Sequence, residues 1–255
     1  MLEKDFEQGM ANLGQTSLEK VPPLTNEMAQ YFSQFKPSMD SSDCYSQIAK
    51  LIAEHGLVAN VAFATLNYEC VLDLALKIAT KQRIVYANPS KPFAAPILWK
   101  LHGGCNLVPD NNWTMQGNTY GIQQIFDGPV KAIEPSAIGS YFDRMDVPPV
   151  MSVYMPGKPT QTSTGILSRI RSEWQEWTES VAAVVVIGAK PILKETYIWQ
   201  PIISGNSKIY WVGGRDGDYE ELAAKLADRL VFLAPTFEAG LTEVLAVLTT
   251  AALTP

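Results

Sequence analysis

The chain has 255 residues, of which 47% are hydrophobic, 18% charged and 10% aromatic, which is typical of a folded globular protein and excludes a disordered chain. Its formal net charge of −6, without a run of basic residues, argues against a nucleic-acid-binding protein. The longest apolar run, Val181 to Ile187, is far shorter than the ~20 residues that cross a bilayer, and residues 1–7 lack the apolar stretch of a signal peptide. We therefore expect a single domain over residues 1–255, a cytoplasmic location and no membrane association.

Cysteine and histidine are scarce, which limits the metal sites and the histidine-based catalysis that the chain can support. The three cysteines, Cys44, Cys70 and Cys105, form no CxxC pair, so a four-thiolate zinc site is excluded and we expect no metal. An odd number of cysteines also fits a reducing compartment. The two histidines, His55 and His102, are the only candidates for histidine-based catalysis.

In the first half of the chain, helical periodicity predicts helices over 24–35, 43–55 and 68–79, with short strands over 58–65, 84–86 and 97–101. His55 precedes Gly56 at the end of a predicted helix, where an imidazole complements the helix dipole, so we expect it to be structural. Residues 105–146 show no clean period, and we interpret them as a small inserted lobe.

In the second half, the pattern predicts helices over 166–181, 219–226 and 237–248 and strands over 182–187, 209–212 and 230–233. The β-branched run Ala182 to Ile187 is typical of a strand buried on both faces, which is the habit of parallel sheets. This alternation predicts an α/β fold with a doubly wound, Rossmann-like, mostly parallel sheet.

Several predicted strands end in loops that carry polar or glycine residues, and ligands of open α/β sheets bind at those strand ends. Four loops have this character: 65–69, 102–106, 188–191 and 213–216. Turn chemistry explains most single strand-end glycines, so only the joint occurrence of the four loops is informative.

Four of the chain's segments resemble motifs of bacterial sirtuin-like (silent information regulator-like) domains. FATLNYE (63–69) resembles the family's TTNYD segment, and KLHGG (100–104) resembles its KLHGS segment. VVIG (185–188) is similar to the strand and glycine that line the cofactor, and VPPLT (21–25) is similar to the PPL that follows the family's phosphate loop. The resemblance extends from about Gly9 to Val212.

The resemblance implies that the chain binds NAD and hydrolyses its nicotinamide–ribose bond, releasing nicotinamide and ADP-ribose. It implies His102 as the general base, because imidazole ordinarily titrates close to neutral pH, and Asn67 as the group that holds a ribose hydroxyl and the attacking water. Without the neighbouring motifs, His102 would be read as a strand-end histidine bonded to a backbone carbonyl. The implied cofactor-binding residues are Gly9, Thr65, Asn67, Gly103, Gly188, Ala189 and Gly213.

Two departures from the family pattern modify this interpretation. Glu7 and Gln8 stand where relatives carry a glycine loop that cradles the pyrophosphate. The absence of CxxC pairs favours NAD hydrolysis, as in antiphage-defence relatives, over lysine deacylation. Two alternatives stay open: a catalytically degenerate sirtuin-like module for nucleotide binding or protein interaction, and a different nucleotide- or glycosyl-processing enzyme on a generic doubly wound sheet. We expect regulation to come from a homo-oligomer or a protein partner.

Overall fold

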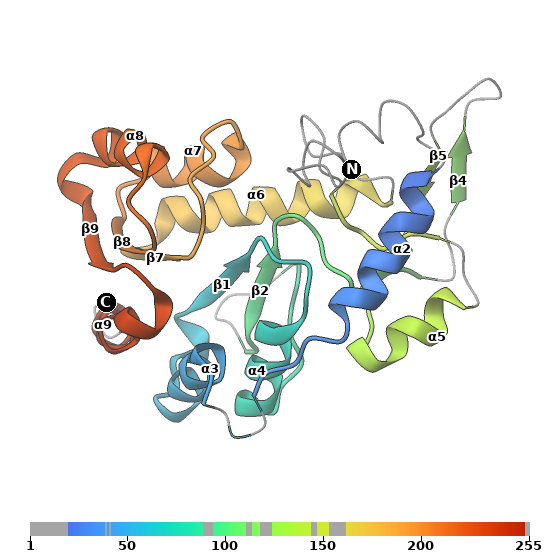
Figure 1. The fold of residues 1–255 in the computed structure, drawn as a ribbon, viewed down its shortest axis with the longest axis horizontal. Coiled ribbons are helices and arrows are strands. Elements are labelled where there is room, and N and C mark those ends of the chain that lie inside the picture. The colour runs from blue at the N-terminus through green and yellow to red at the C-terminus, as the bar shows by residue number, and fades with distance from the viewer. Residues whose placement is uncertain are drawn as a thin grey trace, which may run out of the picture. The chain divides into compact units, whose positions relative to one another are not determined.

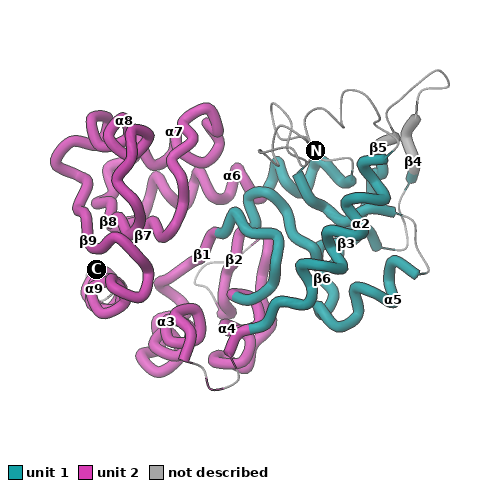
Figure 2. Tube along the Cα trace, viewed as in Figure 1, with its two compact units in different colours: residues 1–36, 65–71, 100–169 teal, residues 37–64, 72–99, 170–255 magenta. Residues whose placement is uncertain are grey.

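The chain folds into two compact units, each assembled from three separate stretches of sequence (Figure 2). The computed structural model describes residues 20–38, 40, 42–88, 94–110, 114–117, 124–143, 147–152 and 162–252 (Figure 1). Unit 1 comprises residues 1–36, 65–71 and 100–169, and unit 2 comprises residues 37–64, 72–99 and 170–255. The expectation of a single domain over 1–255 stays a prediction, and each unit is described by itself.

Unit 2 contains a three-stranded parallel sheet in the order β7-β8-β9. Its strands are β7 (Ala183–Ile187), β8 (Lys208–Val212) and β9 (Leu230–Ala234). β7 pairs with β8 from Ala183 opposite Lys208 to Ile187 opposite Val212, and the β8–β9 register shifts between Trp211 and Val212. Parallel neighbours need a crossover connection, which α7 (Thr196–Ser204) and α8 (Gly217–Leu226) supply. The segment is therefore two successive βαβ units.

Helices pack on both faces of this sheet. On one face the Trp211 ring of β8 lies 6.3 Å from Trp199 of α7 and 5.3 Å from Tyr219 of α8, measured between ring centroids. On the other face, apolar side chains of the three strands share a core with α3 (Cys44–Glu54) and α9 (Phe237–Ala252). The strand pleat explains the division, because successive side chains point to opposite faces.

The rest of unit 2 contains most of β1 (Ala62–Thr65) and β2 (Ile97–Lys100), which pair in parallel; their last residues, Thr65 and Lys100, are counted in unit 1. α4 (Val71–Thr80) connects them and packs on α3 through a core that includes Ala49, Leu76 and Leu98. α6 (Thr164–Ser180) is fastened to β2, since the Trp99 indole donates to the Glu173 carboxylate at 3.0 Å.

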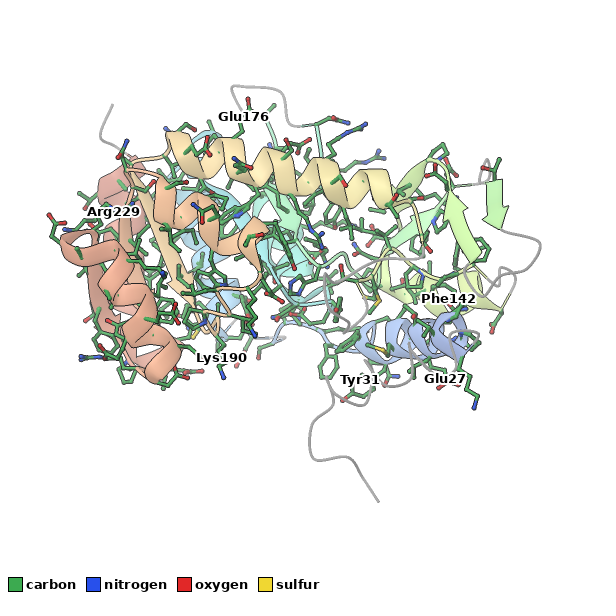
Figure 3. All side chains as sticks on the ribbon, turned by 90° about the horizontal axis from the view of Figure 1, so that it is seen from above. Glu27, Tyr31, Phe142, Glu176, Lys190 and Arg229 are labelled. Carbon is green, nitrogen blue, oxygen red and sulfur yellow. The ribbon has the colours of Figure 1, made fainter. Side chains whose placement is uncertain are left out.

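The end of α7 is held by one arginine, Arg229, which is labelled in Figure 3. Its guanidinium donates to four backbone carbonyl oxygens, those of Ile202, Ile203, Gly205 and Ser207, at 2.5 to 3.3 Å. Carbonyls at a helix C-terminus lack intrahelical donors and carry partial negative charge. Arg229 therefore joins the α8–β9 connection to the end of α7.

Unit 1 combines helices with short antiparallel strand pairs. Its elements in the described residues are α2 (Val21–Phe32), β3 (Leu107–Pro109), β4 (Thr114–Gly117), β5 (Gln124–Asp127), β6 (Val130–Ala132) and α5 (Ile138–Phe142). β3 pairs with β6 and β4 with β5, both antiparallel. Its core holds Ala29, Tyr68, Cys70, Cys105, Ile138 and Met151. The predicted lobe, 105–146, belongs to this unit, although part of it lies outside the described residues.

Comparison with the sequence confirms an α/β chain with parallel strands but corrects several elements. The predicted strand 58–65 is shorter, because Leu57–Ala59 form a 3₁₀ helix and only Ala62–Thr65 are extended. Of the predicted strand 84–86, only a single bridge between Val85 and Ile97 remains. β7 was expected to be buried on both faces, yet only Val186 of its five residues is buried and the other four are partly exposed, since β7 lies at an edge of the described sheet.

Helix α7 was not predicted at all. Its sequence, TYIWQPIIS, places the polar residues Thr196, Gln200 and Ser204 four positions apart on one exposed face, but Pro201 in its interior is typical of a helix break. Among the helices of the described ranges, none combines the length and the apolar character needed to cross a membrane.

Candidate functional site

The loop that follows β1 carries Asn67, whose amide is held in place locally. The Asn67 backbone N–H donates to Thr65 Oγ1, and its side-chain Nδ2 donates to Glu69 Oε1, both at 3.1 Å. The other carboxylate oxygen of Glu69 accepts the backbone N–H of Val71, the first residue of α4. Asn67 is exposed. Its planar amide is thus oriented on the surface of unit 1, with a carbonyl oxygen and one N–H available for other partners.

The loop that follows β2 carries His102, which is buried with 4% of its surface exposed. Its ring is tilted against the Tyr68 ring, with the centroids 6.4 Å apart. The backbone carbonyl of His102 accepts the N–H of Ser152 at 2.8 Å, and the Tyr68 hydroxyl donates to the Ser152 carbonyl at 2.6 Å. Tyr68 therefore links the Asn67 loop to the segment that holds His102.

Two glycines follow His102, and packing accounts for both. Gly103 has a φ of +79°, and a Cβ there would lie 1.9 Å from the backbone oxygen of Val150. The same Val150 oxygen accepts the N–H of Gly104 at 2.9 Å. A Cβ on Gly104 would lie 2.5 Å from Cδ of Lys100. The backbone of Val150 therefore leaves no room for a side chain at Gly103, and the buried Lys100 side chain crowds one at Gly104.

The two loops form one hydrogen-bonded assembly, which we term the strand-end cluster and define as residues 65–71 and 100–106. The N–H of Leu101 donates to the Thr65 carbonyl at 3.0 Å, and the N–H of Cys105 donates to the Tyr68 carbonyl at 2.9 Å. A third connection runs from Lys100 Nζ to the Glu69 carbonyl at 2.7 Å. The two predicted catalytic residues, Asn67 and His102, therefore lie on loops that are bonded directly to each other in unit 1.

The structure adds two residues to the cluster that sequence reasoning passed over, Lys100 and Tyr68. Lys100 is fully buried, and its ammonium contacts the Asn67 loop. A lysine inside the apolar strand ILWKL was an available signal, because an ammonium is seldom buried without polar partners. The role of Tyr68 depends on Ser152, 84 residues away, and no local pattern encodes that contact.

The other predicted cofactor-binding residues lie in unit 2, after β7 and β8. The N–H of Gly188 donates to the Val212 carbonyl at 2.8 Å, and that of Gly213 donates to the Ala234 carbonyl at 2.9 Å. A Cβ on Gly213 would lie 3.8 Å from the Gly188 nitrogen, so the two glycines are neighbours at the carboxyl end of the sheet. Ala189 follows Gly188, and Lys190, labelled in Figure 3, pairs with Asp218 at 3.0 Å.

Three further expectations concern individual residues or metal ligands. Gly9, Glu7 and Gln8, on which the predicted phosphate loop depends, lie outside the described residues. His55 is the C-cap of α3, which confirms its predicted position at a helix end. Within the described ranges, no group of three or more His, Cys, Asp or Glu side chains is arranged to hold a metal ion.

No protein-family model matches the chain, and no curated protein matches its sequence significantly. The sirtuin-like resemblance of the short segments therefore stays a prediction.

Proposed function

We propose that the chain is a sirtuin-like protein with a Rossmann-like fold that binds NAD and hydrolyses its nicotinamide–ribose bond at the strand-end cluster. One observation carries the proposal: the two segments that resemble the family's motifs, 63–69 and 100–104, are joined by hydrogen bonds where β1 and β2 end. These segments are separated in sequence by α4, so their meeting is a property of the fold. Strand ends of this kind are where α/β sheets bind ligands.

The reaction needs a water positioned on one face of the ribose and a base that accepts its proton. As the bond from C1′ to the nicotinamide nitrogen breaks, its electron pair leaves with neutral nicotinamide and C1′ acquires oxocarbenium character. Water then adds to C1′ and releases one proton. In our proposal His102 accepts that proton, and the exposed amide of Asn67 holds a ribose hydroxyl and the water.

The difference in exposure between the two side chains supports this division of roles. Asn67 is exposed and is oriented by Glu69, so it suits a group that meets the ribose directly. His102 is 4% exposed and lies beside the Tyr68 ring, so it suits a base that acts on one sequestered water. Binding of NAD must therefore bring a water within hydrogen-bonding distance of the imidazole.

The burial of His102 also favours a second candidate function, nucleotide binding without turnover. An imidazole that is 4% exposed is also consistent with a purely structural role. Because packing alone accounts for Gly103 and Gly104, neither glycine requires a ligand to explain it. In this alternative the cluster is a rigid loop assembly on a degenerate sirtuin-like module.

The test is nicotinamide release from NAD by the purified protein and by three variants. We expect His102→Ala to lower the rate about 100-fold or more, because a general base contributes at least about that factor. We expect Asn67→Ala to lower it less and His55→Ala, which removes the other histidine, to leave it unchanged. Equal release by wild type and all three variants would contradict the catalytic assignment.

Titration calorimetry with NAD and ADP-ribose distinguishes the two candidate functions. Binding together with nicotinamide release supports hydrolysis, and binding without release supports the degenerate module. Binding of neither ligand contradicts both. The assignment of Gly188, Ala189 and Gly213 to the nucleotide stays a prediction, and substitution of Ala189 by Glu should weaken NAD binding if it is correct.

A further inference from the structure

Two of the three cysteines lie side by side in the core of unit 1. The sulfur atoms of Cys70 and Cys105 are 3.5 Å apart, and the two residues are not joined by a disulfide. Both residues are fully buried, in the core cluster that contains Ala29, Ile138 and Met151. A disulfide requires a sulfur–sulfur distance of about 2.05 Å, so the two atoms need to approach by about 1.5 Å.

The pair occupies a defined place in the fold, where the two loops of the strand-end cluster meet. Cys70 directly follows Glu69, and Cys105 directly follows Gly104. The backbone is already tied at this point, because the N–H of Cys105 donates to the Tyr68 carbonyl at 2.9 Å. The backbone therefore holds the two segments together beside the contact, and both cysteine side chains are buried, so the contact does not depend on a surface side chain.

The side-chain nitrogen of a lysine lies beside one of the two sulfurs. Lys100 Nζ is 3.6 Å from Cys70 Sγ, and Lys100 is fully buried. The thiolate is the reactive form of cysteine, and a neighbouring ammonium stabilises its negative charge. Of the two thiols, Cys70 is therefore the one expected to react first with an oxidant; because both are fully buried, a peroxide reaches them only when the core of unit 1 opens locally.

We propose that Cys70 and Cys105 form a reversible redox pair that closes an intrachain disulfide when the protein meets a peroxide. The Cys70 thiolate attacks one peroxide oxygen, which gives a sulfenic acid and one molecule of water or alcohol. The Cys105 thiol then displaces the hydroxyl group as water and forms the sulfur–sulfur bond. Two thiols lose two protons and two electrons, and the peroxide is reduced; a dithiol reductant reverses the change.

The disulfide would join the loop of Asn67 covalently to the loop of His102 and close a ring over 35 residues of sequence. Such a ring restricts the unfolded chain more than the folded one, so oxidation should raise the melting temperature of unit 1. This proposal does not depend on NAD chemistry, because both the bond and its effect on stability are measured without a nucleotide.

The third cysteine, Cys44, provides the internal control. It lies at the start of α3 in unit 2 and is partly exposed, and burial together with the nearby Glu238 raises the pKa of its thiol. The experiment therefore uses the full chain with Cys44→Ser, so that Cys70 and Cys105 are the only thiols. Two matched variants in that background, Cys70→Ala and Cys105→Ala, each retain a single thiol.

The three proteins are treated with hydrogen peroxide, unfolded, alkylated and weighed by mass spectrometry. We expect the two-thiol protein to lose 2 Da (two hydrogens), to resist alkylation, to yield a linked Cys70–Cys105 peptide, and to regain both thiols after dithiothreitol. We also expect its melting temperature to rise on oxidation, while the single-thiol variants show no such rise.

Two results would overturn the proposal. One is complete alkylation of both thiols after peroxide treatment; the other is oxidation of the two-thiol protein to sulfinic acid as readily as the single-thiol variants. If either alanine variant fails to fold, the peptide map of the two-thiol protein still decides the outcome, because it requires only the Cys44→Ser chain.

Discussion

Substitution of Gly103 by alanine tests whether the loop after β2 is shaped by packing. Gly103 has a φ of +79°, and its missing Cβ would lie 1.9 Å from the Val150 oxygen. That oxygen belongs to an antiparallel bridge between Gly103 and Met151. Alanine at position 103 must therefore push the two backbones apart, in addition to holding a left-handed conformation.

The expected cost follows from these two terms. A non-glycine residue in the left-handed region costs roughly 1–2 kcal/mol. Separation of the backbones breaks two hydrogen bonds, from Gly104 to Val150 and from Ser152 to His102, each contributing about 1 kcal/mol. Gly103→Ala should thus lower the free energy of unfolding by about 3–4 kcal/mol. Gly188 has a similar φ of +63° with nothing within 4 Å of a Cβ, so Gly188→Ala should cost only about 1–2 kcal/mol.

Urea unfolding followed by far-ultraviolet circular dichroism measures both variants against wild type. Because the two glycines lie in different units, hydrogen exchange followed by mass spectrometry adds a local reading for peptides from each unit. Gly103→Ala should accelerate exchange in the peptides that contain His102 and Ser152. A cost for Gly103→Ala no larger than that for Gly188→Ala would refute the claim that backbone contact selects this glycine.

Two further predictions concern unit 2. Arg229→Met should lower the free energy of unfolding by about 2–4 kcal/mol, because it removes a charged donor from four carbonyls at the end of α7. In the same urea denaturation assay, Arg229→Lys should recover only part of this loss. Burial opposes the shift at Asp43, but hydrogen bonds from Ser46 and Ser38 outweigh it and lower the pKa of this carboxyl. Because its pKa is lower in the folded state, the ionised Asp43 carboxyl stabilises the fold above about pH 4, and this contribution is lost as the pH falls through the folded pKa. Melting curves should therefore show that Asp43→Asn loses less stability than wild type on acidification below about pH 4.

Where a local pattern is strong, the sequence predicts the fold well. The amphipathic pattern over 166–181 and the β-branched run after it correspond closely to α6 and β7, because each element is encoded by its own periodicity. Asp43 begins α3 by accepting the Ser46 N–H, as a capping residue should. Such signals require no knowledge of distant residues.

The errors arise where tertiary contacts decide the structure. Val58 carries a β-branched side chain, yet Leu57–Ala59 form a 3₁₀ turn, with Leu57 and Val58 in the core shared with α3 and α9. α7 is helical despite Pro201 because Trp199 packs on Trp211 and Arg229 binds the carbonyls beyond its last turn. In both cases packing overrides a local preference, that of a β-branched residue at Val58 and that of a proline at Pro201.

For the candidate site, the sequence points to the positions but not to the bonds between them. The position of Asn67 and His102 after two strands could be predicted, because parallel strands of one sheet end at the same edge. Their connection through Tyr68, Lys100 and the cysteine pair could not, because each contact joins residues 30 or more positions apart. The exposure of Asn67 and the burial of His102 likewise result from the packing of unit 1.

The structure explains some of the strand-end glycines by packing or backbone conformation and leaves another unexplained. Gly103 is required by its φ and by Val150, and Gly104 by the Lys100 side chain, so a ligand is not needed to account for either. Gly214, next to the predicted Gly213, has neither a left-handed φ nor any atom within 4 Å of a Cβ. Among the described residues of the four strand-end loops, Gly214 is therefore a glycine that neither packing nor conformation explains. Close approach of a ligand to the backbone would explain it, and the proposed function assigns its neighbour Gly213 to the nucleotide.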